Sequence, residues 1–189
     1  MRIFLVGVAC IGKSTIGRHL AEKLGYVFFD FDTELEMFYG KSIPRLKAEF
    51  LTEYSFRADV GSKVLKKIID ENQAEDYVVA MSPSGLNAPY GKVIRGIDSI
   101  TIVLEDAPEN ILKRITFYDD DSNLIEKQLT DEERKMYLRE IKKDITYYKR
   151  PYTKADYHVD ISGLDAAQSA EKLAEIFNAA DSGEPRCGW

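Results

Sequence analysis

A glycine-rich segment near the start of the chain has the spacing of a phosphate-binding loop. Residues 7 to 15 read Gly-Val-Ala-Cys-Ile-Gly-Lys-Ser-Thr. In such a loop the backbone N–H groups wrap a phosphate chain, and the positive end of the following helix dipole adds to the attraction. Lys13 is then expected to reach the β- and γ-phosphates, and the Ser14 hydroxyl to bind Mg²⁺. The residues expected to contact the nucleotide here are Gly7, Cys10, Ile11, Gly12, Lys13, Ser14 and Thr15.

Two carboxylates follow the second apolar run of the chain. Residues 26 to 29 are apolar, and Asp30 and Asp32 come directly after them. An aspartate at the end of an apolar strand is typical of a residue that helps hold Mg²⁺ beside a phosphate loop, which is the role we expect for Asp30. In an extended segment Asp32 would point the same way, so we expect it to bind the acceptor hydroxyl and act on its proton. The alternative for Asp32 is a cap on the next helix.

Apolar strand patterns alternate with helix patterns along the chain. We expect strands over residues 3–6, 26–29, 77–80, 100–104 and 157–161, and helices over 16–24, 33–39, 43–50, 56–71, 108–117, 130–149 and 165–179. Apolar strands separated by helices predict a parallel sheet covered on both faces. We therefore expect an α/β fold, a three-layer α/β/α P-loop NTPase with a five-stranded parallel sheet and a helical lid. Ligands bind beyond the carboxyl ends of such strands.

The chain of 189 residues suits one domain. We expect a single kinase domain over residues 1–180, with a lid at about 117–130, and a flexible tail over 181–189. Within the lid region, Thr130 and Glu133 have the spacing of a capping box.

The bulk composition excludes several partners. The net charge of −6 argues against nucleic acid. No apolar run reaches the roughly 18 residues that span a membrane, and the start of the chain lacks the zones of a signal peptide. We therefore expect a cytoplasmic protein that is a monomer or weak homodimer and acts on a small molecule with a hydroxyl group.

From about residue 2 to residue 161 the sequence resembles the shikimate kinases. The similarity is greatest in Lys13–Gly17, in Leu24–Tyr26 and in the Asp-x-Asp formed by Asp30 and Asp32. The resemblance implies ATP and Mg²⁺ as cofactors, a metal role for Asp30 and an acceptor role for Asp32. Lys13 and Asp32 are then the expected catalytic residues.

The resemblance also assigns three arginines. Arg57, in a Phe-Arg pair, implies a guanidinium that binds the acceptor carboxylate, a task that a bidentate pair performs well. Arg114 resembles the arginine beside the adenine, and Arg150 lies in a segment similar to Arg-x-x-x-Tyr…Ala-Asp. The alternatives are solvated helix-face arginines at 57 and 114, and a cation that stabilises a helix end at 150.

Three places depart from the family pattern. Ser82-Pro83-Ser84 stands where the family has three glycines, and we expect Ser84 and Gly85 to line the acceptor site. Val60 stands where an acidic residue is usual. The lid begins Phe-Tyr-Asp-Asp-Asp at residues 117–121 instead of carrying an arginine, so we expect the aspartates to face solvent or to contact a cationic acceptor or another Mg²⁺.

These features favour an ATP-dependent small-molecule kinase that transfers the γ-phosphate to an acceptor hydroxyl. One alternative is a nucleoside or nucleotide kinase with a different acceptor. Another, suggested by the acidic lid, is a regulatory protein that binds a nucleotide without efficient transfer. A GTPase is disfavoured, since the sequence contains no Asn-Lys-x-Asp segment.

Overall fold

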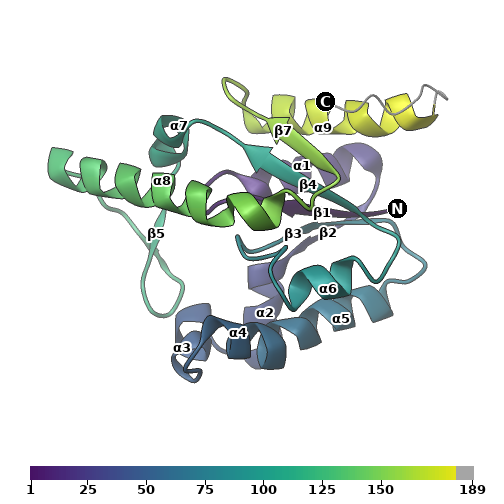
Figure 1. Ribbon diagram of the computed structural model, residues 1–189, viewed down its shortest axis with the longest axis horizontal. Helices are drawn as coiled ribbons and strands as arrows, with labels where there is room; N and C mark the ends of the chain where they lie inside the picture. Colours follow the sequence, from purple (N-terminus) through teal and green to yellow (C-terminus); the bar gives the residue numbers. More distant parts are fainter. Residues whose placement is uncertain (182–189) are drawn as a thin grey trace.

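The structure, a computed structural model, describes the chain over residues 1–181. The expected tail, residues 181–189, lies outside the described residues except for its first residue. A five-stranded parallel sheet forms the centre of the molecule, with the strand order β2-β3-β1-β4-β7 (Figure 1). The strands are β1 (Arg2–Val6), β2 (Val27–Asp30), β3 (Tyr77–Ala80), β4 (Ile100–Glu105), β5 (Phe117–Tyr118), β6 (Leu124–Ile125) and β7 (Tyr157–Asp160). The predicted fold class and all five predicted sheet strands are confirmed.

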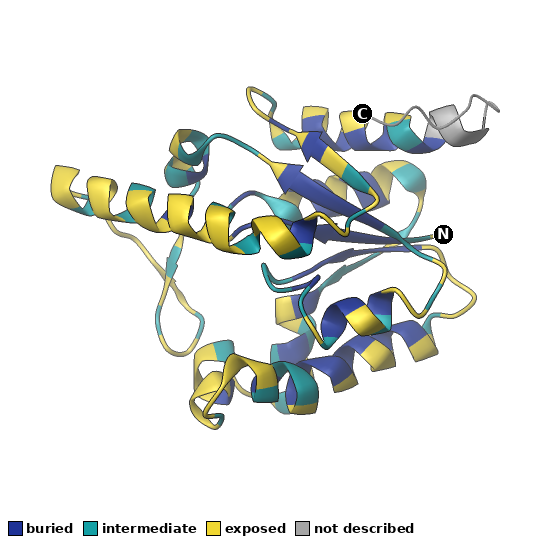
Figure 2. Cartoon of the chain, viewed as in Figure 1, coloured by how far each residue is buried: buried dark blue, intermediate teal, exposed yellow. Residues whose placement is uncertain are grey.

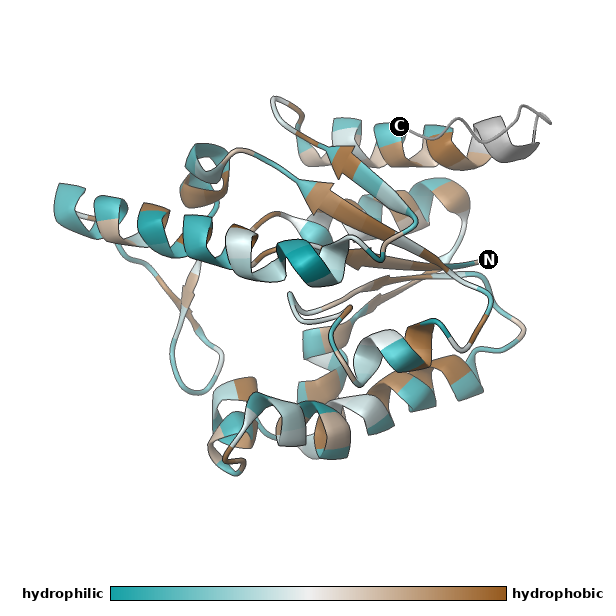
Figure 3. Cartoon of the chain, viewed as in Figure 1, coloured by the Kyte–Doolittle hydropathy of each residue, from teal (hydrophilic) through white to brown (hydrophobic). Residues whose placement is uncertain are grey.

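The middle strands are buried on both faces because helices cover the sheet on each side. Every residue of β3 is buried, as are the last four residues of β1. Figure 2 shows these strands as a continuous buried layer, and Figure 3 shows that the same strands are the most hydrophobic part of the fold. The uninterrupted apolar runs at 3–6, 77–80 and 100–104 thus correspond to strands that are buried on both faces.

The helices form two layers around the sheet. They are α1 (Lys13–Leu24), α2 (Phe31–Tyr39), α3 (Ile43–Ala48), α4 (Glu53–Phe56), α5 (Ser62–Glu71), α6 (Tyr90–Ile94), α7 (Pro108–Lys113), α8 (Asp131–Tyr152) and α9 (Ala166–Asp181). Helix α1 packs against α9 on one face, while α5 packs against α2 and α6 on the other (Figure 1). Gly17 lets α1 approach the sheet, since a Cβ atom there would lie 2.8 Å from the Phe28 ring.

The helical stretch expected over residues 56–71 begins earlier and is not uniform. It starts at Glu53 because the Thr52 side chain caps α4 by accepting from the Ser55 N–H at 3.1 Å. A π-helical turn, Arg57–Gly61, joins α4 to α5. Such turns are rare and are found often at functional sites, and here the turn begins at Arg57.

The lid segment differs from the expected helix. Residues 117–125 form the antiparallel hairpin β5–β6, and α8 begins at Asp131, where the predicted capping box of Thr130 and Glu133 is confirmed. The reason is turn chemistry: the Asp119 carboxylate accepts from the N–H groups of Asp121 and Asn123, at 2.9 and 2.8 Å. Helix α7 accordingly ends at Lys113 rather than at residue 117. Among the described residues, no helix is long and apolar enough to cross a membrane.

Candidate active site

The glycine-rich loop connects β1 to α1 and is shaped by three residues with positive φ. Gly7, Cys10 and Gly12 have φ values of 153°, 59° and 109°. No side chain of the described residues caps the start of α1, so the first N–H groups of this helix are free to bind an anion. Ser14 and Thr15 are exposed at this end, whereas the Ile11 side chain is buried and offers only its backbone to a ligand. The loop therefore fits a phosphate chain.

Lys13 folds over this loop. Its Nζ donates to the carbonyl oxygens of Gly7 and Val8, each at 2.9 Å. Loss of hydration lowers the pKa of Lys13 to about 8, although the Asp32 carboxylate, the Cys10 side chain and the Asp30 carboxylate act in the opposite direction. A bound phosphate would give the ammonium group an anionic partner in place of these carbonyl oxygens.

Asp30 and Asp32 are placed differently from the sequence expectation. The expectation that both belong to an extended segment is wrong, because α2 begins at Phe31. Asp30 is the residue that caps this helix, and its Oδ1 accepts from the N–H groups of Asp32 and Thr33 at 3.1 and 3.3 Å. Asp32 does not cap the helix and is free to face the adjoining cleft.

The surroundings of Asp32 disfavour its charged form. Loss of hydration raises the pKa of its carboxyl to about 6, and the Asp30 carboxylate raises it further, whereas Lys13 and Lys47 lower it. A carboxylate with a pKa near 6 is a far better proton acceptor than an ordinary aspartate. Asp32 is therefore suited to the role of base that the sequence assigned to it.

A cleft of about 290 Å³ lies beside Asp32 and is lined by Arg57, Ser82, Pro83 and Ser84 among others. The Arg57 side chain is 14% exposed; its Nε donates to the Ala88 carbonyl at 3.2 Å. These contacts hold the guanidinium at the cleft wall with donors left over for an anion. Arg57 is thus a cleft residue and not a solvated helix-face cation.

Ser84 and Gly85 have different surroundings. Ser84 lines the cleft, and its hydroxyl lies 3.3 Å from that of Ser82. Gly85 does not line it: a Cβ atom there would lie 2.7 Å from the Met81 Cβ and 2.9 Å from the Val6 Cγ1. Glycine at this position permits close packing against β1, and its expected contact with the acceptor stays a prediction.

The other two expected arginines lie outside this cleft. Arg114 pairs with Asp106, whose side chain is 1% exposed and also accepts from Asn110 and Ser162. Burial raises the pKa of Asp106, but these hydrogen bonds outweigh it and the pKa is lowered. Arg150 is exposed in the last turn of α8, a place that suits the helix-end alternative. Their roles toward adenine and acceptor stay predictions.

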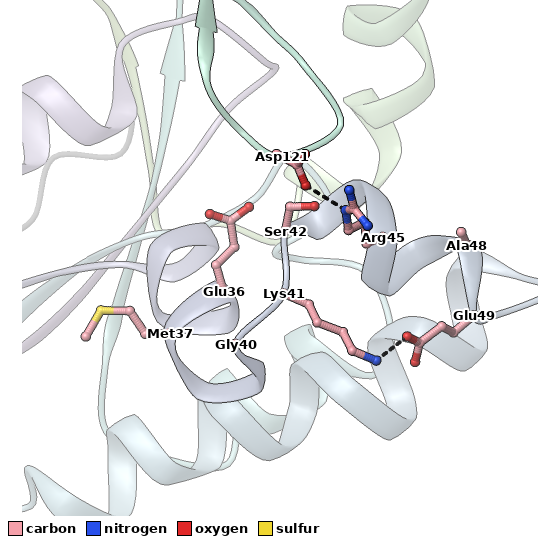
Figure 4. A pocket seen from close by; sticks show the side chains of 9 residues that line it. All are labelled: Glu36, Met37, Gly40, Lys41, Ser42, Arg45, Ala48, Glu49 and Asp121. Carbon is pink, nitrogen blue, oxygen red and sulfur yellow. Dashed lines mark hydrogen bonds and ion pairs between the residues drawn. The ribbon is translucent and has the colours of Figure 1, made fainter.

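The acidic tip of the lid contacts the protein itself. Asp121 accepts from Arg45 Nε at 2.7 Å, Ser42 donates to the Asp120 carbonyl, and Ser122 donates to Glu36 at 2.5 Å. Figure 4 shows Arg45 and Asp121 facing each other across the edge of an open hollow of about 1030 Å³. We call this group, Arg45 with Asp121 and Ser42 with Asp120, the lid contact. It joins the hairpin to the start of α3, and the bond from Ser122 to Glu36 joins it to α2.

Several cleft residues were not identified from the sequence. They are Lys47, Glu53, Tyr90, Tyr147 and Tyr148. Glu53 lies between two cations, 3.2 Å from Lys47 Nζ and 3.8 Å from an Arg57 guanidinium nitrogen. Its position four residues before Arg57 was the available signal, since such pairs are neighbours on a helix. Tyr147 and Tyr148 gave a weaker signal, since they are an aromatic pair in a highly charged helix.

No cluster of three or more His, Cys, Asp or Glu side chains that could hold a metal occurs among residues 1–181. This is compatible with Mg²⁺, which keeps several water ligands and is bound mainly through substrate phosphates and one or two protein groups. The roles of the Ser14 hydroxyl and the Asp30 carboxylate as such groups stay predictions.

The parallel sheet, the glycine-rich loop with Lys13, and the cleft beside it define a P-loop kinase. The shikimate kinase family model matches residues 9–178. The chain belongs to the shikimate kinase family, whose members transfer a phosphoryl group to a hydroxyl acceptor.

Individual relatives agree with this assignment. The chain is 30% identical over 182 residues to a shikimate kinase from Halorhodospira halophila, with 96% of each chain covered. It is 34% identical over 177 residues to one from Chlorobaculum tepidum, covering 90% of this chain and 87% of that protein.

Solved structures of shikimate kinases share the fold of this chain. The structure of shikimate kinase from Bacteroides thetaiotaomicron superposes with a TM-score of 0.75 at 23% identity, covering 94% of this chain and 98% of that one. The shikimate kinase from Acinetobacter baumannii in complex with shikimate has a TM-score of 0.72 at 27% identity, covering 95% and 93%.

Proposed function

We propose that this protein transfers the γ-phosphate of ATP to a hydroxyl group of shikimate. The observation that carries the proposal is the cleft beside the phosphate loop, which combines an elevated-pKa carboxylate, Asp32, with a held guanidinium, Arg57. Shikimate offers hydroxyl groups and one carboxylate, which match these two groups in charge. The relative from Acinetobacter baumannii was solved with shikimate bound.

In this proposal each side chain acts on a separate part of the substrates. Lys13 leaves its carbonyl partners and binds the terminal phosphates, while the N–H groups at the start of α1 bind the rest of the chain. Ser14 and Asp30 would hold Mg²⁺ beside the phosphates, where the ion would supply positive charge against the charge that develops during transfer. Asp32 accepts the hydroxyl proton and orients the oxygen, and Arg57 fixes the acceptor carboxylate.

Kinetics with shikimate test the proposal directly. ADP release should depend on shikimate, and Arg57→Ala should raise the KM for shikimate by about 100-fold, because a bidentate carboxylate contact is lost. The KM for ATP should stay within about threefold. Arg139→Ala, which removes an exposed arginine of α8 outside the cleft, is the matched control. ADP release that ignores shikimate but responds to another polyol or a nucleoside would reject shikimate as the acceptor.

A second candidate is a nucleotide-binding protein with little transferase activity. It is favoured by the lid, since residues 117–130 contain no arginine and their one cation, Lys127, pairs with Glu133 at 2.7 Å. The transferring phosphoryl group would then lack a cation from the lid. Tight ATP binding without ADP release in the presence of shikimate or other acceptors would support this candidate.

A further inference from the structure

Tyr90, the first residue of α6, brings a phenol group to the wall of the cleft beside Asp32, which we call the acceptor cleft. It lines this cleft together with Asp32 and Arg57, although it is only 1% exposed. Its ring packs edge-on against the Phe31 ring, with the centroids 5.3 Å apart and an angle of 81° between the planes. Phe31 directly precedes Asp32 in α2. Packing therefore fixes the phenol in the wall that also carries the expected base.

A glycine of the π-helical turn makes room for this phenol. A Cβ atom at Gly61 would overlap the Tyr90 hydroxyl oxygen and the adjoining ring carbons. The φ of Gly61 is −64°, a value that every residue adopts, so the backbone there does not require glycine. Glycine also weakens the interior of a helix. Gly61 is therefore explained by the space that the phenol occupies, and the turn that provides this space begins at Arg57.

The Tyr90 hydroxyl has no protein partner. The similarly buried hydroxyl of Tyr152 donates to the Pro83 carbonyl at 2.9 Å, whereas that of Tyr90 hydrogen-bonds to no group among residues 1–181. Burial raises the pKa of Tyr90 well above its usual range, so the hydroxyl keeps its proton at neutral pH. A buried hydroxyl group without a partner costs free energy. Because Tyr90 lines the acceptor cleft, a ligand bound there can supply the missing partner.

The charged groups of the acceptor cleft leave a distinct task for Tyr90. Asp32 and Arg57 are matched to the reacting hydroxyl and to the carboxylate of the acceptor. Lys47 and Glu53 pair with each other at 3.2 Å. Tyr90 is neutral, and its hydroxyl can donate one hydrogen bond and accept another. It therefore suits a second, uncharged hydroxyl group of the acceptor, which has the same donor and acceptor capacity.

We propose that Tyr90 is a specificity-determining residue that hydrogen-bonds a hydroxyl group of the acceptor other than the one that is phosphorylated. The acceptor class is then a carboxylate that carries at least two hydroxyl groups. This proposal rests on the proposed function, because shikimate is the acceptor in both. An acceptor without the second hydroxyl would leave the buried phenol unpaired, and sites built to hydrogen-bond a substrate hydroxyl reject such analogues strongly.

Kinetics with shikimate analogues test the role of Tyr90. Each analogue lacks one ring hydroxyl group that is not phosphorylated. For one of them the unaltered enzyme should have a kcat/KM about 100-fold lower than for shikimate. In Tyr90→Phe this ratio should fall to about tenfold or less, because the variant has no hydroxyl to leave unpaired. The KM of the variant for shikimate should rise about tenfold, while the KM for ATP should stay within about threefold.

Tyr77→Phe is the matched control. The Tyr77 hydroxyl is buried and has no hydrogen-bond partner among the described residues, and Tyr77 begins β3, at the opposite end of this strand from the cleft. This variant also removes one buried phenol oxygen. Its ratio of kcat/KM between shikimate and the analogue should stay at about 100-fold. The melting temperatures of the two variants show what the loss of a buried oxygen does to stability alone.

The outcomes separate substrate recognition from packing. If Tyr90→Phe melts at a lower temperature or is slower with every acceptor but keeps the ratio of the unaltered enzyme, the hydroxyl is structural and the proposal is overturned. An unaltered enzyme that uses shikimate and every analogue equally well would overturn it too.

Failure of the unaltered protein to phosphorylate shikimate would instead contradict the proposed function. The same ratio, measured for the polyol or nucleoside that does support ADP release and for its analogues lacking one hydroxyl, then decides the role of Tyr90. Loss of discrimination in Tyr90→Phe would support this role, and an unchanged ratio would overturn it. The absence of any acceptor would overturn both proposals.

Discussion

The phosphate loop and the acceptor cleft lie next to each other at the carboxyl ends of the strands, but they are built in different ways. The loop is one continuous segment, residues 7–15, and its shape depends on backbone conformation at Gly7 and Gly12. The cleft is assembled from α2, α3, α4, the π-helical turn, the loop after β3, α6 and the end of α8. Its chemistry depends on which side chains these separate segments bring together.

This difference explains where the chain departs from its family. A backbone site for phosphate tolerates few substitutions, because a side chain at a glycine with positive φ strains the loop. A site made of side chains from separate elements can change one wall while the rest remains. Ser82-Pro83-Ser84 changes such a wall, and Glu53, one helical turn before Arg57, lies 3.8 Å from its guanidinium group.

Lys13→Ala should lower activity more than any other single substitution. It should act through the phosphate loop and leave the acceptor cleft unchanged. Loss of a cation on the transferring phosphates should lower kcat/KM by about 1,000-fold. The measurement is acceptor-dependent ADP release, with binding of shikimate measured separately and expected to change little. Lys23→Ala, on the exposed side of the same helix, is the control. Near-normal turnover in Lys13→Ala would remove the basis for the contrast between the two sites.

Asp32→Asn should affect the acceptor side, lowering kcat/KM for the acceptor about 100-fold through loss of the base. The unaltered enzyme should lose activity below a pH of about 6, the pKa of Asp32, and the variant should lack this acid limb. An exposed aspartate changed in the same way, Asp70→Asn, should keep the unaltered profile.

Asp32→Asn should be more stable than the unaltered protein at neutral pH, although it should be less active. The pKa of Asp32 is raised from 3.8 to about 6 in the folded protein, so the folded state binds this proton more tightly than the unfolded chain does. The contribution of Asp32 to stability is therefore complete below pH 4 and is lost as the pH rises through 6. At pH 7.5 Asp32→Asn should melt above the unaltered protein. A lower melting temperature with normal activity would mean that Asp32 has only a structural role.

The sequence predicted the phosphate loop and the sheet because both are local. Glycine spacing defines the loop, and apolar runs of four to six residues define the strands. Asp30 was correctly expected where β2 ends and Asp32 just beyond it, but α2 begins at Phe31, so Asp30 and not Asp32 caps the helix. The cleft could be predicted only in part, since the contacts of Tyr148 and Lys47 with it depend on packing between elements far apart in sequence. The acidic lid gave no signal of its partner, Arg45, because the two are 76 residues apart.

Breaking the lid contact should have the smallest effect on activity. This change tests whether the hairpin closes over the phosphate loop and the acceptor cleft together. Arg45 and Asp121 are both well exposed, so their ion pair should change the KM for the acceptor by only about twofold to fivefold. Arg45→Ala and Asp121→Asn should each raise this KM. The double variant should resemble either single one, because the two changes remove the same interaction.

Salt provides an independent check of the lid contact. Raising the ionic strength screens an exposed pair, so the difference between Arg45→Ala and the unaltered enzyme should shrink as salt increases. Lys41→Ala breaks a neighbouring exposed pair with Glu49 that does not involve the lid, and it serves as the matched control. Additive effects in the double variant would show that Arg45 and Asp121 act separately. The acidic hairpin would then close over the phosphates without an ion pair to Arg45 of α3.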